Sequence, residues 1–218
     1  MRDPRPNGQE HSIVFVGSLN PKIFQPAWFW HYDLLKKEEA DAAKIEIIHP
    51  DVVVFSLDWL RIEVTRDRFT IRTPQEPYDQ VIRDIALGTF DLLQHTPLTA
   101  MGINRSMHFS MGSEERWHAA GHRLTPKGVW SEILEQPGMR AIVMQGQRQD
   151  GLKGNQIVQV EPSTTVEFGI FVLVNDHYAA NPETMGAGEM VAILKDKWEA
   201  SYQRSEETIY SLLERLHE

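Results

Sequence analysis

The sequence contains no cysteine, which excludes disulfide bonds, thiolate metal ligands and cysteine nucleophiles. It has no run of 18 apolar residues, and its start, MRDPRPNGQE, lacks the apolar core of a signal peptide. We therefore expect a cytoplasmic protein without a membrane-spanning segment. Positive charge is also scarce, because 22 Lys and Arg stand against 31 Asp and Glu, a formal net charge of −9. Such a chain repels phosphate backbones, which argues against nucleic acid as a partner.

Common catalytic motifs are missing as well. The sequence has no Gly-x-x-x-x-Gly-Lys-Ser/Thr loop, no Gly-x-Gly-x-x-Gly, no Gly-x-Ser-x-Gly and no His-Glu-x-x-His. These absences argue against the common nucleotide-binding and hydrolase classes. They leave open an enzyme whose catalytic residues are scattered along the chain.

The patterns that are present predict both strands and helices within one domain, residues 1–218. Leu60, Ile62 and Val64 alternate with polar residues, which indicates a sheet with one solvated face. The predicted strands are 12–16, 45–50, two or three over 52–73, about 99–111, 139–146, 156–160 and 165–174. The predicted helices run from 26 to about 41, from 77 to about 93, from 113 with a restart at 126–134, and from about 188 to 216.

The order β, α, several β, α occurs twice along the chain. We predict an α+β fold with a largely antiparallel sheet built from two β-α-β(n)-α units, about 12–95 and 97–217, and helices packed mainly on one face. A saddle-shaped duplicated sheet is the favoured arrangement. A single curved sheet that grips the terminal helix is the alternative.

The segment EERWHAAGH is the strongest candidate for catalytic chemistry. On a helix, Glu114, His118 and His122 follow each other at four-residue intervals and share one face. Two imidazoles and a carboxylate can ligate a divalent metal such as zinc. Alternatively, Gly121 frays the helix and the histidines are surface residues. Candidates for completing a metal site are His108, Asp176 and His177.

A group of arginines is predicted on the solvated face of a hairpin. Arg61, Arg68 and Arg72 project from adjacent strands, and Arg66 lies at their turn. Guanidinium groups arranged in this way suit carboxylate or phosphate ligands. The alternative is that Glu63 and Asp67 neutralise them in ordinary cross-strand pairs.

Arg105 falls among apolar residues in the strand TAMGINRSMHFSM. An unpaired buried charge is too costly, so either the residue is paired or the strand register breaks. A bulge at Gly102 would break the register. Otherwise, Asp176 or Glu167 would pair with Arg105 and line a cavity.

The segment QPAWFWHYDLL places several aromatic residues on the first helix. Because successive helical residues point about 100° apart, Trp28, Phe29 and Trp30 cannot all face one sheet. We expect Phe29 or Trp30 to protrude and to mark an interface with a second copy or a protein partner. Alternatively, the N-terminal arm or the terminal helix covers it.

The arginine hairpin, the helix after Pro77, GINRSMHF and the VNDHY strand end before a long helix together resemble a loosely defined family of uncharacterised bacterial proteins. The resemblance covers roughly residues 55–217, although Gly102-Ile103-Asn104-Arg105 is shorter than the family's Gly-x-x-x-Asn-Arg-like segment. It implies the architecture and carries no activity, because none is established for that family.

Two functions therefore stay open. The favoured one is a non-enzymatic binding or accessory protein that acts through a protein–protein interface and needs no cofactor. The alternative is a metal-dependent hydrolase built on Glu114, His118 and His122, in which the metal would activate a bound water.

Overall fold

The computed structural model describes residues 5–181 and 186–217. Within them, nine strands form one antiparallel sheet, in the order β2-β3-β4-β5-β1-β6-β9-β8-β7, together with five α-helices. The strands are β1 (Gly8–Gly17), β2 (Lys44–His49), β3 (Val52–Ser56), β4 (Arg61–Thr65), β5 (Arg68–Thr73), β6 (Leu98–Ser110), β7 (Ile142–Gln147), β8 (Gly154–Pro162) and β9 (Gly169–Ala179). The helices are α1 (Pro26–His31), α2 (Lys37–Ala42), α3 (Asp79–Leu92), α4 (Glu114–Leu124) and α5 (Ala187–His217), with short 3₁₀ turns η1 (Pro21–Ile23), η2 (Glu76–Tyr78) and η3 (Trp130–Glu132).

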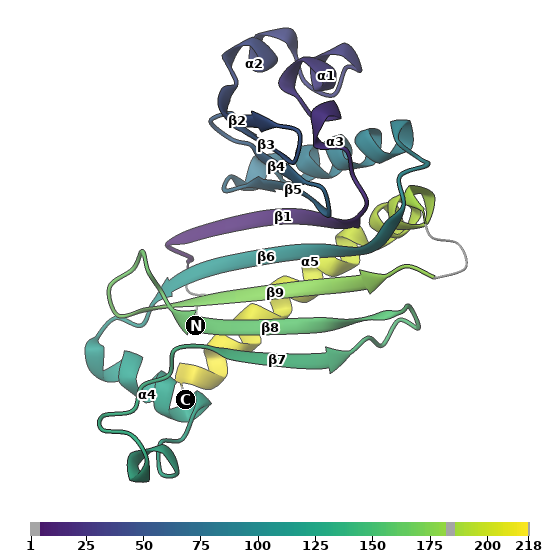
Figure 1. The fold of residues 1–218 in the computed structure, drawn as a ribbon. Coiled ribbons are helices and arrows are strands. Elements are labelled where there is room, and N and C mark those ends of the chain that lie inside the picture. Colours follow the sequence, from purple (N-terminus) through teal and green to yellow (C-terminus); the bar gives the residue numbers. More distant parts are fainter. Residues whose placement is uncertain (1–4, 182–185, 218) are drawn as a thin grey trace.

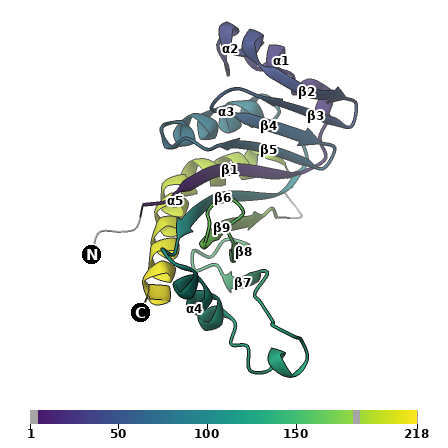
Figure 2. The same ribbon diagram turned by 90° about the vertical axis from the view of Figure 1, so that its left-hand side faces the viewer.

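The helices α3 and α5 lie on the same side of the sheet (Figures 1 and 2). α3 packs on β1 and β5, and the long α5 crosses β6 and β9 (Figure 1). α4 contacts the C-terminal part of α5 at the other end of the molecule. Every helix in the described part of the chain is too short or too polar to cross a membrane.

The buried apolar residues form two clusters. The larger cluster lies under α1 and α3 and contains a group of interleaved phenylalanines, among them Phe15, Phe69 and Phe90. The smaller cluster lies between β6, β9, α4 and the C-terminal half of α5. α5 contributes Leu194 and Trp198 to the first cluster and Ile209 to the second, so one helix joins both.

The mixed fold with an antiparallel sheet is as the sequence predicts, and of the two or three strands expected over 52–73, three are present. The prediction of one continuous helix from 26 to about 41 is wrong, because this segment forms two helices, α1 and α2. Between them, Asp33 has φ of 57°, a left-handed conformation that cannot continue an α-helix.

Three further expectations need correction. The segment treated above as an N-terminal arm belongs to the sheet from Gly8 onward, where it forms β1 in antiparallel pairing with β6, while residues 1–4 lie outside the described residues. The last strand starts later than predicted, since Phe168 has φ of 47° and ends a turn before Gly169. The helix expected to restart at 126 is reduced to the turn η3.

Candidate functional site

A belt of charged side chains lies between α5 and the middle of the sheet, where the inner face of α5 passes from one apolar cluster to the other. Asp176 on β9 and Arg105 on β6 are only 2% and 3% exposed. On α5, the small buried residues Ser201 and Ser205 leave room for these larger polar groups. We call this set of residues the charge belt, and it has two parts.

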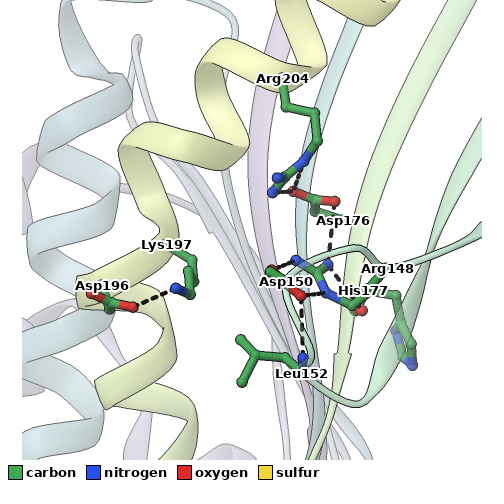
Figure 3. Close-up of polar contacts among 8 residues, drawn as sticks. All are labelled: Arg148, Asp150, Leu152, Asp176, His177, Asp196, Lys197 and Arg204. Atoms are coloured by element: carbon green, nitrogen blue, oxygen red, sulfur yellow. Dashed lines mark hydrogen bonds and ion pairs between the residues drawn. The ribbon is translucent and has the colours of Figure 1, made fainter.

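The first part of the belt is centred on Asp176 (Figure 3). Arg204 of α5 donates to Asp176 Oδ2 from Nη2 at 2.6 Å, and Arg148 donates to Oδ1 from Nη1 at 3.3 Å. Arg148 also donates to Asp150, and its guanidinium lies 3.8 Å from the centre of the Tyr178 ring. Two arginines therefore balance two aspartates in a partly buried cluster, in which Arg148 and Asp176 are buried, and the cluster ties α5 to β9.

Hydrogen bonding and burial shift the pKa values in this part of the belt. The hydrogen bond from Arg148 lowers the pKa of Asp150. Burial lowers the pKa of Arg148, but Asp150, Tyr178 and Asp176 outweigh it and the net shift is upward. Both groups are thus held in their charged forms.

The second part of the belt surrounds Arg105. Its guanidinium lies 4.3 Å from the centre of the Tyr202 ring, and its Nη2 lies 3.3 Å from Glu206 Oε1 and 3.7 Å from Glu76 Oε1. His11, directly opposite Arg105 on β1, stacks on Tyr202 with ring centres 5.3 Å apart. Burial, and then the charge of Arg105, lower the pKa of His11 to about 4, so this imidazole is neutral at pH 7.

Arg105 is therefore a buried, paired charge, and the predicted bulge at Gly102 is wrong. β6 keeps one register with β9 from Ala100 to Ser110, and its shift against β1 lies at Val16 and Gly17 instead. The predicted partners are wrong as well, because Glu206 and Glu76 take this role. Asp176 is engaged by Arg148 and Arg204.

Sequence reasoning missed Arg148 and Arg204. Arg148 follows β7 in a loop, and nothing in its local pattern marks it as buried. Arg204 had a signal: the apolar stripe of α5 is interrupted by Ser201 and Ser205, between Trp198 and Ile209. Both serines are buried and lie on the side of α5 that faces the charge belt.

The arginines of the hairpin are mostly neutralised by carboxylates from neighbouring strands. Arg61 forms a two-bond pair with Glu46 of β2, Arg66 pairs with Asp51, and Arg72 lies 3.4 Å from Glu10 of β1. These are not the partners predicted, Glu63 and Asp67. Arg68 forms no ion pair with the described residues, and it lies at the border of a groove on the sheet.

That groove, about 500 Å³ in volume, lies on the face of the sheet opposite to the charge belt. Its floor includes an amide pair in which Asn175 Nδ2 donates to Asn104 Oδ1. Beside this pair, Gly102 leaves the space that a side chain would take, since a Cβ there would lie 2.9 Å from Asn175 Nδ2. The rest of the floor mixes Val14 and Leu173 with polar side chains.

The aromatic residues of the first helix have different environments. Phe29 is fully buried against Phe55, so the expectation that it protrudes and contacts a partner is wrong for this residue. Trp28 is half-buried, and Trp30 is 41% exposed. α1 is only six residues long, and its inner side carries Phe29 while Trp30 points outward.

Trp30 borders a second groove, about 620 Å³, between α1, α2 and α3. We call it the aromatic groove. Trp59 and Tyr78 stack on one another in its wall, with ring centres 4.5 Å apart. Leu34 and Val81 add apolar surface, and the rim carries both signs of charge in Lys36, Lys37, Glu38 and Glu39.

The predicted metal ligands do not form a metal-binding group. His118 Nε2 lies 3.7 Å from Glu114 Oε1, and both side chains are at least half-exposed. Within the described residues, no three or more His, Asp or Glu side chains are arranged to hold a metal ion. His122 therefore does not complete a site with Glu114 and His118.

No protein-family model matches the sequence, and a search of curated proteins found no match. The resemblance based on GINRSMHF and VNDHY thus gains no support from these comparisons. Function has to be inferred from the surfaces of the molecule.

Proposed function

We propose that this chain is a non-enzymatic binding protein that holds a segment of another protein in the aromatic groove. The observation that carries the proposal is the exposed Trp30 at the border of a groove whose wall holds Trp59 and Tyr78. Exposed aromatic rings beside a concave surface are typical of protein interfaces, because they bury a large area at little conformational cost.

The groove also indicates the chemistry of the partner. Its floor is apolar and its rim carries lysines and glutamates in similar number. A highly charged ligand of one sign gains little from such a rim, whereas an apolar peptide segment buries its side chains against the rings. We therefore propose a polypeptide with apolar or proline residues as the occupant.

The two-unit organisation of the fold is also our proposal. It is supported by the strand order, in which β5-β1 and β9-β6 meet at the centre and the meanders β2-β3-β4-β5 and β7-β8-β9 run outward. Each meander is followed by a helix, α3 or α5, that packs back on the sheet. Under this proposal, β1 corresponds to β6 and β5 to β9, and the helices pack mainly on one face.

Selection from a random peptide library against the purified protein tests the proposed function. We expect selected peptides to share an apolar or proline-containing motif and to bind in the aromatic groove. Trp30→Ala should weaken them about 30-fold, the effect of removing an interface tryptophan worth about 2 kcal/mol. Isothermal titration of the selected peptides measures this change.

Trp130→Ala is the matched control, because Trp130 is 51% exposed but lies far from the groove, in η3. It should leave peptide affinity unchanged. Failure to select any peptide, or equal affinity for wild type and Trp30→Ala, would refute the proposal. Circular dichroism of both variants establishes that each is folded.

A further inference from the structure

β7 is an edge strand that lacks the usual protection of sheet edges. It pairs with β8 on one side, in an unbroken register from Ile142 to Gln147, and it ends the sheet. From Ala141 to Gln147 the sequence AIVMQGQ carries no charge and no proline. Such an edge presents unpaired backbone N–H and C=O groups that readily pair with another strand.

The opposite edge, β2, provides an internal comparison. Although Ile45, Ile47 and Ile48 are exposed there, β2 is irregular, with its register shifted between Ile45 and Ile47. It also carries Lys44 and Glu46. Bulges and charges of this kind hinder edge-to-edge pairing. β2 is therefore protected, and β7 is not.

Exposed apolar side chains are frequent in β7 and in the segment that leads into it. Six of the thirteen large hydrophobic side chains that are exposed among the described residues lie between 129 and 144. Trp130 and Leu134 line a hollow together with Arg140 and Ala141, which lead into β7. We call these six residues the β7 corner: Val129, Trp130, Ile133, Leu134, Val143 and Met144.

The two-unit organisation adds a topological argument, and this step alone rests on that proposal. If β9, β8 and β7 correspond to β5, β4 and β3, the counterpart of β2 would lie beside β7. No strand of the described residues takes that position. The second unit is thus one strand short at the edge where the β7 corner is exposed.

We propose that a second copy of the chain pairs with β7 through its own β7, antiparallel, so that one sheet continues across two subunits. The sequence of β7 is self-complementary in the register that places Val143 opposite Val143 of the second copy. Ile142 then lies opposite Met144 on one face, and Arg140 lies opposite Gly146, so no like charges meet. The resulting dimer has twofold symmetry, and each subunit contributes the same surface patch to the interface.

Analytical ultracentrifugation at micromolar concentrations tests the proposal. Wild type should sediment as a dimer of the 25.1 kDa chain. Val143→Lys places a charge at the centre of the pairing and should weaken the dimer at least tenfold. Ile47→Lys, the same change on the β2 edge, should leave it intact. A monomeric wild type, a Val143→Lys dimer of unchanged affinity, or equal weakening by Ile47→Lys would overturn the proposal.

Cross-linking tests the register independently. Because the chain has no cysteine, Val143→Cys supplies a single thiol that would face its own copy across the twofold axis. Cβ atoms of directly opposed residues lie roughly 4.5–5.5 Å apart, within reach of a short bis-maleimide. Gln147→Cys is the control, since its two copies would be about 26 Å apart along the strands. Cross-linking at 147 and not at 143 would contradict the register.

This dimer is distinct from the binding function proposed above. α1, which carries Trp30, lies near the β2 end of the sheet, and β7 forms the other end (Figure 1). Trp30→Ala should therefore weaken peptide binding about 30-fold, as argued above, and leave the dimer unchanged. Val143→Lys should weaken the dimer and leave peptide binding unchanged. Either proposal can therefore fail without the other.

Discussion

Asp176 shows how a single buried residue organises its surroundings. Its two carboxylate oxygens are taken by arginines from different elements, Arg148 after β7 and Arg204 on α5. A buried ion pair of this kind gains little net stability over apolar packing, because desolvation offsets attraction. Removing one partner is costly, however, since the other charges stay buried without compensation. We infer that the belt fixes the position of α5 on the sheet more than it stabilises the fold.

His11 makes a pH-dependent contribution that can be isolated. Its pKa is about 4 in the folded protein against 6.5 ordinarily, so between these values the unfolded chain binds a proton that the folded chain does not. Stability is therefore lost as pH falls from 6.5 toward 4, by about 3 kcal/mol at most. His11→Phe, which keeps a ring against Tyr202, should remove this loss. Urea unfolding of both proteins from pH 7 to pH 4 measures it.

The comparison with His11→Phe controls for the other titrating groups. Burial also lowers the pKa values of His108 and His177, and their contributions have the same sign in both proteins. They cancel in the difference between wild type and variant. If the two stability curves stay parallel from pH 7 to pH 4, His11 is not kept neutral by the fold.

At the scale of elements, regular patterns were predictable and irregular ones were not. The alternation of Leu60, Ile62 and Val64 was sufficient to predict β4, and the helix expected from about 188 to 216 corresponds to α5. The break between α1 and α2 was not predictable, because it depends on one left-handed residue, Asp33, among good helix formers. Local periodicity carries no information on such a turn.

The charge belt was predictable only in part, for a similar reason. Strand alternation placed Arg105 on the same side of the sheet as its apolar neighbours, where it is buried. This could be predicted because the side on which a residue lies depends on its own strand alone. Its partners Glu76 and Glu206 belong to η2 and α5, distant in sequence. Whether these two glutamates lie near Arg105 depends on the position of α5 on the sheet. That position is set by tertiary packing, which local sequence patterns do not reveal.

Asp33 allows a test of the break between α1 and α2. With φ of 57° it adopts a conformation that costs an ordinary residue about 1–2 kcal/mol, costs glycine little and is least tolerated by β-branched residues. Asp33→Gly should therefore raise the free energy of unfolding by up to about 1 kcal/mol. Asp33→Val should lower it by about 1–2 kcal/mol. Chemical denaturation of the three proteins measures both changes.

The opposite ranking, with Asp33→Val more stable than Asp33→Gly, would mean that the segment is helical in solution. Lys37→Gly is a suitable control, because Lys37 is an exposed residue at the start of α2. Glycine in a helix costs about 1 kcal/mol relative to alanine, so it should destabilise there. Substitution by glycine is thus expected to raise the free energy of unfolding at Asp33 and to lower it at Lys37.

At the scale of the whole molecule, the continuous sheet and α5 join two apolar clusters that the charge belt separates. Leu194 lies in the first cluster and Ile209 in the second, and both are fully buried. Fifteen residues of helix hold them about 22 Å apart. Because polar side chains lie between the clusters, a cavity in one cluster should not be filled by rearrangement of the other.

Leu194→Ala and Ile209→Ala test this independence. Each should lower the free energy of unfolding by about 2–5 kcal/mol, and the double variant should lose the sum of the two within about 0.5 kcal/mol. Ile209→Ala and Leu213→Ala share a cluster and lie one helical turn apart, so their effects should depart from additivity. Guanidinium unfolding of the single and double variants completes both cycles. A coupling between Leu194 and Ile209 as large as that between Ile209 and Leu213 would mean that the belt transmits packing changes along α5, and that the two clusters behave as one core.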